Sequence, residues 1–343
     1  MINMSDKRYL AARTGNMEQI AYARRSVLTE GKADGIRIID INNGGGLSCT
    51  LLESRCLDIS RVEYRGVNIG FLAKPGLVAP QFCEPGGFVR YFQAGMLYTC
   101  GLDNVGPACR DDRGEWPMHG RLGITPAGNV KTDINWDNDE ILISGKVGQG
   151  ALFGPNLVFE RHIRIPLFGK DITIEDRIEN QGFGEEEIML LYHLNIGWPM
   201  LSEDAVLEIT NDGRISGRDS EAEKGIDRWN LFEAPSDLRP EQAFYHSPVC
   251  SDDGNAHAVV WNKKIKLGID ISFDPSVLPY LVEWKSMASG DYALGIEPST
   301  CLVGGRESEK RAGRILLLKP YETMDFRITL KVVAEKENSK KGK

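Results

Sequence analysis

Alternating hydrophobic and polar positions dominate the chain from residue 36 onward. The clearest case is 157–182, where LVFERHIRIP and DITIEDRIENQG alternate on both sides of a turn at 168–171. A period of two indicates a β-strand that buries one face and exposes the other. The segment therefore predicts a β-hairpin with one dry and one wet face.

A second hairpin is predicted where AHAVVWN (256–262) and KLGIDISFD (266–274) are joined across Lys263 and Lys264. Many short strands without a long helical period predict an all-β, large antiparallel β-sandwich rather than βαβ units. The sequence has no fixed-period repeat of the kind that predicts a propeller or a solenoid. Further short apolar or alternating runs, bounded by Gly, Asn, Asp or Pro, predict strands at 36–44, 46–54, 140–147, 206–210, 292–298, 314–320 and 324–335.

The segment 6–29 has a different pattern. Its alanines and long straight side chains surround Leu10 and Ile20, which is typical of helix, and we expect Gly15 and Asn16 to divide it into two short helices. Two roles stay open for this segment: a contact in a homodimer, or packing on the sandwich.

These patterns predict the domain organisation. We expect a helical N-terminal extension at 1–34, one β-sandwich domain at 35–335 and a disordered basic tail at 336–343. One large domain is favoured because no Ser/Pro/Gly-rich linker divides the chain. The 343 residues, of which 41% are hydrophobic, suffice for a sizeable core.

Charge and hydropathy narrow the partners. The net charge is −8, and phosphate-backbone binding needs a clustered basic surface, so we expect no nucleic-acid partner. No run approaches the roughly 18 apolar residues of a membrane-spanning helix, and the first residues lack the apolar core of a signal peptide. We therefore expect no membrane partner and a cytoplasmic location.

Sequence motifs for metals and nucleophiles are missing. The seven cysteines are odd in number and never in CxxC spacing, which indicates reduced thiols rather than disulfides or a zinc site. No GxSxG or HExxH motif occurs, and no GK[ST] follows the glycines at 44–46. We expect no metal and no cofactor.

Three of the five histidines, His119, His193 and His246, lie where a strand pattern gives way to irregular sequence. A strand end can hold a polar side chain rigidly in a cleft; the alternative is a buried histidine bonded to a backbone carbonyl. Glu297 ends an apolar run before a proline, where an unpaired charge is unfavourable. The combination of Glu297 with two of these histidines and with Arg121, which follows His119 by two residues, suits acid–base chemistry on a sugar hydroxyl or carbonyl.

Aromatic residues near the same strand ends can supply a flat apolar surface for a pyranose ring. For each of them, packing in the core is the alternative. They are Tyr98, Trp116, Trp198 and Trp284.

Several motifs carry a family resemblance, in the order RYFQAGMLYTCGLDNVG (90–106), MHGRLGITPA (118–127), LLYHLNIGWPML (190–201), LPYLVEWK (278–285) and LGIEP (294–298). This series is similar to the aldose 1-epimerase (galactose mutarotase-like) superfamily. More narrowly, it resembles the bacterial branch of that superfamily defined as a domain of unknown function. The resemblance covers about residues 35 to 335 and implies a supersandwich with a carbohydrate site on one concave sheet.

The resemblance also implies residue roles. His119, in MHG, would hold and polarise the sugar, and His193 would act as general acid toward the ring oxygen. Glu297 would act as general base on the anomeric hydroxyl, and Arg90 would contact sugar hydroxyls. The implied partner is a small-molecule sugar.

The chain departs from the family in the residues that bind the hydroxyl groups of the sugar. Where mutarotases carry an aspartate in a DHxF-like motif, FYHSPV places Tyr245 at the aspartate position with His246 beside it, and HGR replaces HGG. Substrate identity is therefore not transferable. The candidate substrate-binding residues are Arg90, Asp103, Asn104, Arg121, Tyr245, His246, Trp284 and Lys285.

Three functions follow as expectations. The first is an aldose 1-epimerase-like isomerase that interconverts sugar anomers by acid–base ring opening. The second is a sugar-binding or sugar-sensing protein that has lost catalysis. The third is a sugar epimerase or isomerase that acts at another carbon.

Overall fold

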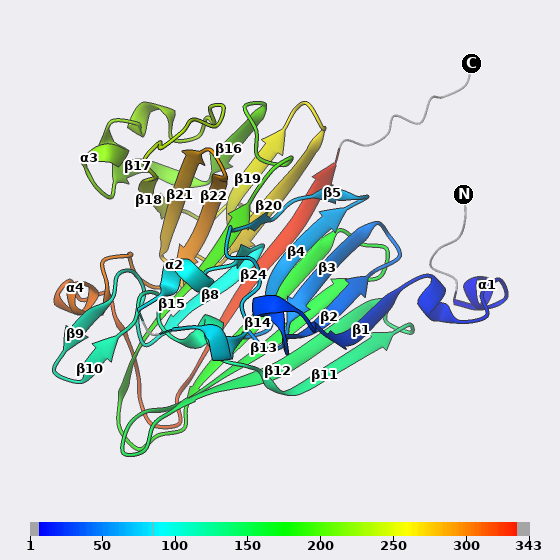
Figure 1. The fold of residues 1–343 in the computed structure, drawn as a ribbon, viewed down its shortest axis with the longest axis horizontal. Helices are drawn as coiled ribbons and strands as arrows, with labels where there is room; N and C mark the ends of the chain where they lie inside the picture. The colour runs from blue at the N-terminus through cyan, green and yellow to red at the C-terminus, as the bar shows by residue number, and fades with distance from the viewer. Residues whose placement is uncertain (1–6, 85, 335–343) are drawn as a thin grey trace.

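The computed structural model describes residues 7–84 and 86–334, and its main elements are antiparallel β-strands (Figure 1). The basic tail predicted at 336–343 lies outside the described residues. None of the helices in the described part is long and apolar enough to cross a membrane. The large antiparallel sheets confirm the predicted all-β sandwich.

One layer of the sandwich is a sheet that we call the back sheet. Both predicted hairpins belong to it, as β13–β14 and β19–β20, because their alternating residues present one continuous apolar face. In spatial order its strands are β11 (Gly128–Asn135), β12 (Glu140–Gly150), β13 (Asn156–Pro166), β14 (Asp171–Asn180), β24 (Thr323–Ala334), β20 (Leu267–Phe273), β19 (Ala256–Asn262) and β16 (Ala205–Ile209).

The facing layer is a sheet that we call the site sheet. Its strand β15, which carries His193, also pairs with β8, so residues 97 to 102 lie directly beside His193 in the sheet. In spatial order its strands are β17 (Asn211–Gly217), β18 (Gln242–Pro248), β21 (Tyr280–Ala288), β22 (Asp291–Ser299), β15 (Glu186–Ile196) and β23 (Leu316–Leu318), with β8 (Leu97–Leu102) beside β15.

A third sheet, formed by the N-terminal strands, lies next to the back sheet (Figure 1). Two short strand pairs complete the β structure, β6 (Phe71–Leu72) with β7 (Ala94–Gly95) and β9 (Cys109–Asp111) with β10 (Gly114–Trp116). The strands of the N-terminal sheet are β1 (Tyr22–Val27), β2 (Arg37–Asn42), β3 (Leu47–Leu52), β4 (Asp58–Tyr64) and β5 (Val67–Asn68).

The helices are short and lie at the edges and over the site sheet. Helix α2 packs on the site sheet through Phe88 and Tyr91, which join Tyr98 and Leu191 in one apolar cluster. The α-helices are α1 (Lys7–Ala11), α2 (Phe88–Tyr91), α3 (Ser220–Glu223) and α4 (Arg306–Arg311), and the 3-10 helices are η1 (Met17–Gln19), η2 (Gly31–Ala33), η3 (Pro80–Phe82), η4 (Leu122–Ile124) and η5 (Ile226–Arg228).

The N-terminal prediction needs one correction. Two short helices, α1 and η1, flank the expected break at Gly15 and Asn16, but the helical prediction is wrong for Tyr22–Val27, which forms β1. This strand pairs with β2 along its whole length, and hydrogen bonds from the neighbouring strand outweigh local helix propensity. The predicted domain boundaries remain predictions, and β1 lies before the predicted start of the sandwich.

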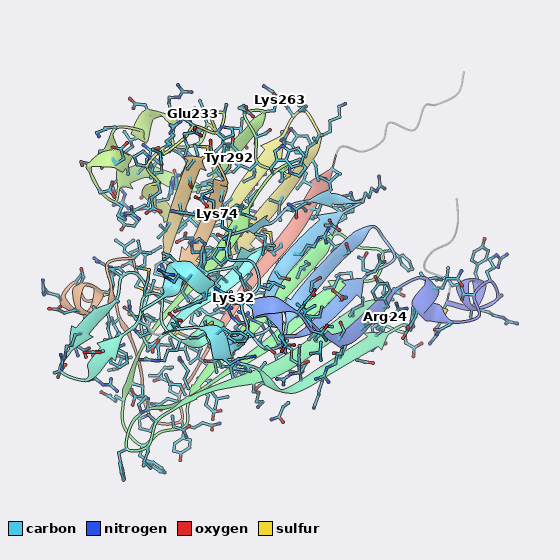
Figure 2. All side chains as sticks on the ribbon, in the orientation of Figure 1. Arg24, Lys32, Lys74, Glu233, Lys263 and Tyr292 are labelled. Atoms are coloured by element: carbon cyan, nitrogen blue, oxygen red, sulfur yellow. The ribbon has the colours of Figure 1, made fainter. Side chains whose placement is uncertain are left out.

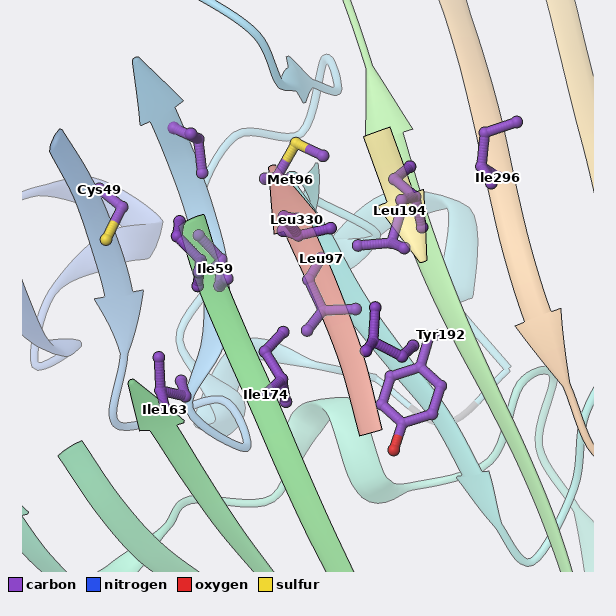
Figure 3. Close-up of a cluster of buried hydrophobic side chains, with 14 of the residues drawn as sticks. Cys49, Ile59, Met96, Leu97, Ile163, Ile174, Tyr192, Leu194, Ile296 and Leu330 are labelled. Carbon is purple, nitrogen blue, oxygen red and sulfur yellow. The ribbon is translucent and has the colours of Figure 1, made fainter. Parts of the chain in front are cut away.

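The core lies between the sheets. Figure 3 shows Ile163, Ile174 and Leu330 of the back sheet facing Tyr192 and Leu194 of β15. Because side chains alternate along a strand, the residues between these, including His193, point to the opposite face of the site sheet. Packing of the core thus determines which residues of β15, His193 among them, point away from the core.

Candidate functional site

His193 and Glu297 lie opposite each other on neighbouring strands of the site sheet. The register that pairs Leu194 with Ile296 places His193 of β15 across from Glu297 of β22. Their side chains meet, with 3.1 Å between His193 Nε2 and Glu297 Oε1. Both are buried, with 6% of His193 and 2% of Glu297 exposed. The fold therefore joins two residues 104 positions apart as one acid–base pair.

The pair has room because Gly295 carries no side chain. A Cβ at this position would lie 2.8 Å from Glu297 Oε1 and 3.1 Å from His193 Cε1. Gly295 lies on the same face of β22 as Glu297, two residues before it. Any other residue there would press on both functional side chains.

His119 lies next to this pair on the loop between β10 and η4. Its ring centroid is 6.2 Å from that of His193, and its backbone has a φ of 57°. The Gly106 N–H donates to His119 Nδ1 at 3.4 Å. In the neutral imidazole the proton then lies on Nε2, which can donate to a ligand oxygen.

Aromatic rings border the two histidines. Phe92, directly after α2, lies 5.2 Å from the His193 ring, and Phe88 lies 5.0 Å from the His119 ring. On the other side, the Trp284 ring of β21 is 5.5 Å from His193. These rings exclude water from the pair, and Trp284, which is half-buried, can present an apolar face to a sugar ring.

Burial sets the charges of the pair. Burial, together with the negative charge of Glu241, raises the pKa of Glu297 to about 8, although Arg218 opposes this shift. Burial and the nearby His119 lower the pKa of His193 to about 3, although a hydrogen-bonding interaction with the Asn195 side chain opposes this shift. At neutral pH the pair therefore carries one proton and no net charge.

His119 also stays neutral. Burial lowers the pKa of its imidazole to about 4, and the negative charge of Glu241 opposes this shift. A neutral imidazole is a hydrogen-bonding group rather than a charged one. His119 can therefore orient a ligand without changing the charge of the site.

Glu241, which was not predicted from the sequence, lies beside the candidate site, bonded to Trp284. Its carboxylate accepts a hydrogen bond from Trp284 Nε1 at 2.6 Å and one from Arg218 Nη2 at 2.9 Å. Its side chain is 48% exposed. The sequence held a signal: Glu241-Gln242-Ala243-Phe244 has the acid and the phenylalanine at the spacing of the DHxF-like motif, four residues before Tyr245.

Tyr245 and Trp284 lie on the same face of the site sheet as Glu297. In register, Tyr245 pairs with Val282, which in turn pairs with Glu297. Burial raises the pKa of Tyr245 to about 12, with a further contribution from the charge of Glu297 and an opposing one from Arg218. The neutral phenol is therefore available as a hydrogen-bonding group.

His246 and Lys285, two predicted substrate-binding residues, are not brought to this face. His246 Nε2 lies 3.0 Å from Glu283 Oε2, and both side chains are fully buried on the core face. Lys285 Nζ donates to the carbonyls of Arg228 and Leu231 at 2.9 and 2.6 Å. These residues hold the segment before β18 against the sheet.

Arg121 and Asp103 form an ion pair with each other and line a pocket of about 600 Å³ that also includes Trp116 but neither His193 nor Glu297. Asn104 is committed to the backbone, since its Nδ2 donates to the carbonyls of Pro107 and Pro117 at 2.9 and 2.8 Å. These predicted residues therefore shape the loop that carries His119.

Arg90 lies on α2, whose inward residues Phe88 and Tyr91 are buried while Arg90 is exposed. Within residues 7–84 and 86–334, no group of three or more His, Cys, Asp or Glu side chains is arranged to hold a metal ion. The structure brings together five side chains as a candidate site: His119, His193, Glu241, Trp284 and Glu297.

A family model described as "Domain of unknown function (DUF4432)" matches residues 33–332 of the chain. No curated protein sequence matches the chain. Among solved structures, the chain is similar to a "putative aldose 1-epimerase" from Klebsiella pneumoniae subsp. pneumoniae MGH 78578. The two share 26% identity over 93% of this chain and 86% of that chain, with a TM-score of 0.86.

Two further structures share the fold at lower identity. A galactose mutarotase-like protein from Clostridium acetobutylicum is 14% identical over 92% of this chain and 99% of that chain, with a TM-score of 0.68. A galactose 1-epimerase from Lactobacillus acidophilus NCFM is 11% identical over 92% of this chain and 99% of that chain, with a TM-score of 0.59. These two matches confirm the predicted sandwich, and the family model together with the Klebsiella pneumoniae structure confirms the predicted superfamily.

Proposed function

Because the chain belongs to the DUF4432 family within the galactose mutarotase-like superfamily, we propose that it is an aldose 1-epimerase-like isomerase that interconverts sugar anomers. The observation that carries this proposal is the buried contact of 3.1 Å between His193 and Glu297. Ring opening of a hemiacetal needs one proton acceptor and one proton donor on the same sugar face or edge. When the proton shared by the pair lies on His193, His193 is the proton donor and the Glu297 carboxylate is the proton acceptor.

Each proton has a place in the reaction. The Glu297 carboxylate takes the proton of the anomeric hydroxyl while the bond from C1 to the ring oxygen breaks. The electron pair of that bond goes to the ring oxygen, which takes a proton from His193. The free aldehyde then rotates about the bond between C1 and C2, and ring closure returns both protons with the roles of the two residues exchanged.

The single proton must lie on His193 before this step. In the free site, burial favours the neutral pair, with the proton on Glu297. The proton can pass to His193 across their contact, and a sugar hydroxyl that donates to Glu297 stabilises the resulting carboxylate. His119 Nε2 donates to a sugar oxygen, and the ring of Trp284 supports the apolar face of the pyranose.

Anomer exchange on a panel of monosaccharides tests this proposal. We expect the wild type to accelerate exchange, measured by NMR or polarimetry, for at least one sugar, and Glu297→Gln to lose at least about 100-fold of that rate. Glu221→Gln, at a partly exposed residue of α3 paired with Lys224, is the matched control. A wild type without acceleration on any sugar, or an active Glu297→Gln, would overturn the proposal.

A sugar-binding protein without catalysis is the second candidate. The raised pKa of Glu297 favours it, because the basic form of this carboxyl is scarce at neutral pH. Calorimetry separates the two candidates: a sugar that binds without faster anomer exchange supports the binding protein.

A further inference from the structure

The buried imidazole of His193 has one ring nitrogen without a partner. Its Nε2 lies 3.1 Å from Glu297 Oε1, whereas its Nδ1 forms no hydrogen bond in the structure. Another buried atom without a partner is Oδ1 of Asn195, two residues further along β15. Buried polar atoms nearly always have hydrogen-bond partners, so two exceptions on adjacent side chains of one strand face need a physical reason.

The side chain of Asn195 is held in one orientation. It is fully buried, and its Nδ2 donates to the His193 carbonyl at 2.8 Å. A carbonyl can only accept, so the amide nitrogen is the atom on that side and the amide oxygen points elsewhere. Across the sheet, Asn195 pairs in register with Gly295, which has no side chain that could bond this oxygen.

The oxygen of Asn195 acts on the ring of His193. Burial and the nearby His119 lower the pKa of His193, and the side chain of Asn195 acts in the opposite direction. A hydrogen bond raises the pKa of an imidazole when it stabilises the protonated ring, and only an acceptor does so. Oδ1 is the acceptor of the amide, so it is the atom that interacts with the ring.

We propose that Asn195 is a positioning residue that sets the tautomer of His193 by accepting a hydrogen bond from Nδ1–H. This inference deepens the proposed function and rests on it. With its proton on Nδ1, the neutral imidazole has its lone pair on Nε2, the nitrogen that faces Glu297. That lone pair can take the proton of Glu297. In the other tautomer Nε2 already carries a hydrogen, and the transfer is blocked.

The same contact supports the protonated ring. Once the proton has passed from Glu297, both nitrogens of His193 carry hydrogen, and each needs an acceptor. Glu297 or the ring oxygen of the sugar accepts from Nε2, and Asn195 accepts from Nδ1. Without Asn195 a buried N–H is left unbonded, so the imidazolium forms less often and ring opening slows.

NMR of the ring nitrogens in isotope-labelled protein tests the tautomer directly, because protonated and unprotonated nitrogens differ in chemical shift. The chain has five histidines, and the resonances that disappear in His193→Gln belong to His193. We expect the wild type at neutral pH to carry the proton of this ring on Nδ1. A wild-type ring with its proton on Nε2 overturns the inference, whether or not any sugar is turned over.

Two variants of Asn195 test its part in this tautomer. In Asn195→Ala we expect the ring of His193 to shift toward the tautomer with its proton on Nε2. We expect kcat for anomer exchange to fall by at least about tenfold while KM changes by less than about twofold, because the residue acts on the proton and not on sugar binding. Asn195→Asp keeps an acceptor oxygen, so it should keep the Nδ1–H tautomer and recover much of the lost rate.

Asn180→Ala is the matched control for the loss of a buried amide. Asn180 is also fully buried, on β14, and its Nδ2 donates to the carbonyls of Gly184 and Leu318 at 2.8 and 2.9 Å. Its removal should lower the midpoint of urea unfolding but leave the tautomer of His193 and kcat at their wild-type values. Equal effects of Asn180→Ala and Asn195→Ala on the tautomer and kcat would overturn the inference, because general loosening would then be the cause.

The outcomes separate this inference from the proposed function. An Asn195→Ala variant with the wild-type tautomer and kcat overturns the role of Asn195 and leaves anomer exchange intact. A wild type that accelerates exchange of no sugar overturns the proposed function, and the NMR spectra still decide the tautomer.

Discussion

At the scale of single residues, the chemistry depends on burial. Glu297 and His193 have pKa values shifted in opposite directions, up and down, because their charged forms lose hydration. The two residues together hold one proton over a wide pH range. This shared proton is the property that an acid–base isomerase needs.

The pH profile of anomer exchange follows from these shifts. Since the pKa of Glu297 is raised to about 8, the pair keeps its proton below that pH and loses it as the pH rises through it. We expect kcat/KM to be level from about pH 5 to 7 and to fall about tenfold per unit above pH 8.

The measurement is NMR exchange from which the buffer- and hydroxide-catalysed rate is subtracted at each pH. In Glu241→Gln the falling limb should move to lower pH, because the negative charge of Glu241 helps to raise the pKa of Glu297. An enzymatic rate that continues to rise beyond pH 9 would contradict the shared-proton model.

Residue identities in the site were partly predictable from the sequence. His119, His193 and Glu297 end strand patterns in a family-like order, and Trp284 was named as an aromatic candidate. Glu241 was missed because an exposed acid before a strand has many solvated counterparts in the chain. Gly295 was missed because its importance depends on a Cβ clash with Glu297, which only the paired strands reveal.

At the scale of elements, helix α2 and the residue after it limit the access of water to His193 and Glu297. Phe92, directly after α2, stacks on Phe88 with ring centroids 4.8 Å apart and lies tilted against the His193 ring at 5.2 Å. Burial is the largest cause of the lowered pKa of His193. Removal of the Phe92 ring should therefore act on the imidazole directly.

We expect Phe92→Ala to raise the pKa of His193 from about 3 toward its ordinary value by at least about one unit, because water reaches the ring. The measurement is an NMR titration of the imidazole resonances. Val89→Ala is the control, since Val89 lies on α2 itself and is 75% exposed. An unchanged titration in Phe92→Ala would show that this ring does not keep water from His193.

Elements were predictable where their pattern was local. Both hairpins were predicted because alternating residues reveal a half-buried strand without knowledge of its partner. Strand β1 was not, because Tyr22–Val27 is held by β2, and a neighbouring strand leaves no trace in local propensity. His246 and Lys285 were grouped with the site because the face that each residue takes depends on strand register.

At the scale of the whole molecule, one buried ion-pair network joins the layers behind the site. Arg161 of β13 bonds Asp176 of β14 through Nε and Nη2 at 2.9 and 2.7 Å. The same guanidinium bonds Asp58 at 2.9 Å and Thr99 of β8 at 2.9 Å, and Tyr192 donates to Asp176 at 2.8 Å. Tyr192 precedes His193, so this network anchors the strand that carries His193.

We expect Arg161→Met to lower the free energy of unfolding by about 3 kcal/mol or more, because two carboxylates are left buried without their cation. The measurement is urea unfolding, followed by circular dichroism. Arg177→Met, on β14 and in an exposed pair with Asp325, should leave the unfolding midpoint unchanged. Equal midpoints for the two variants would show that the buried network contributes no net stability.

Peripheral contacts also close the molecule around its sheets. Lys74, on the segment before α2, bonds Asp291 at 2.6 Å at the tip of the β21–β22 hairpin, and the Tyr292 hydroxyl donates to the Glu233 carbonyl at 2.8 Å. Lys74, Glu233 and Tyr292 are labelled in Figure 2. Such pairings over 59 to 217 positions are invisible to any local pattern.

The alternation of side chains along β18 and β21 divides their residues into a set that packs in the core and a set on the opposite face. Phe244, Glu283 and Lys285 are constrained by the core, whereas Tyr245 and Trp284 on the same strands lie on the opposite face, with Glu297. Substitutions in the second set leave the packing of the core unchanged. The fold can therefore stay common to proteins that differ on this face, and the chain shares its fold with structures only 11 to 26% identical to it.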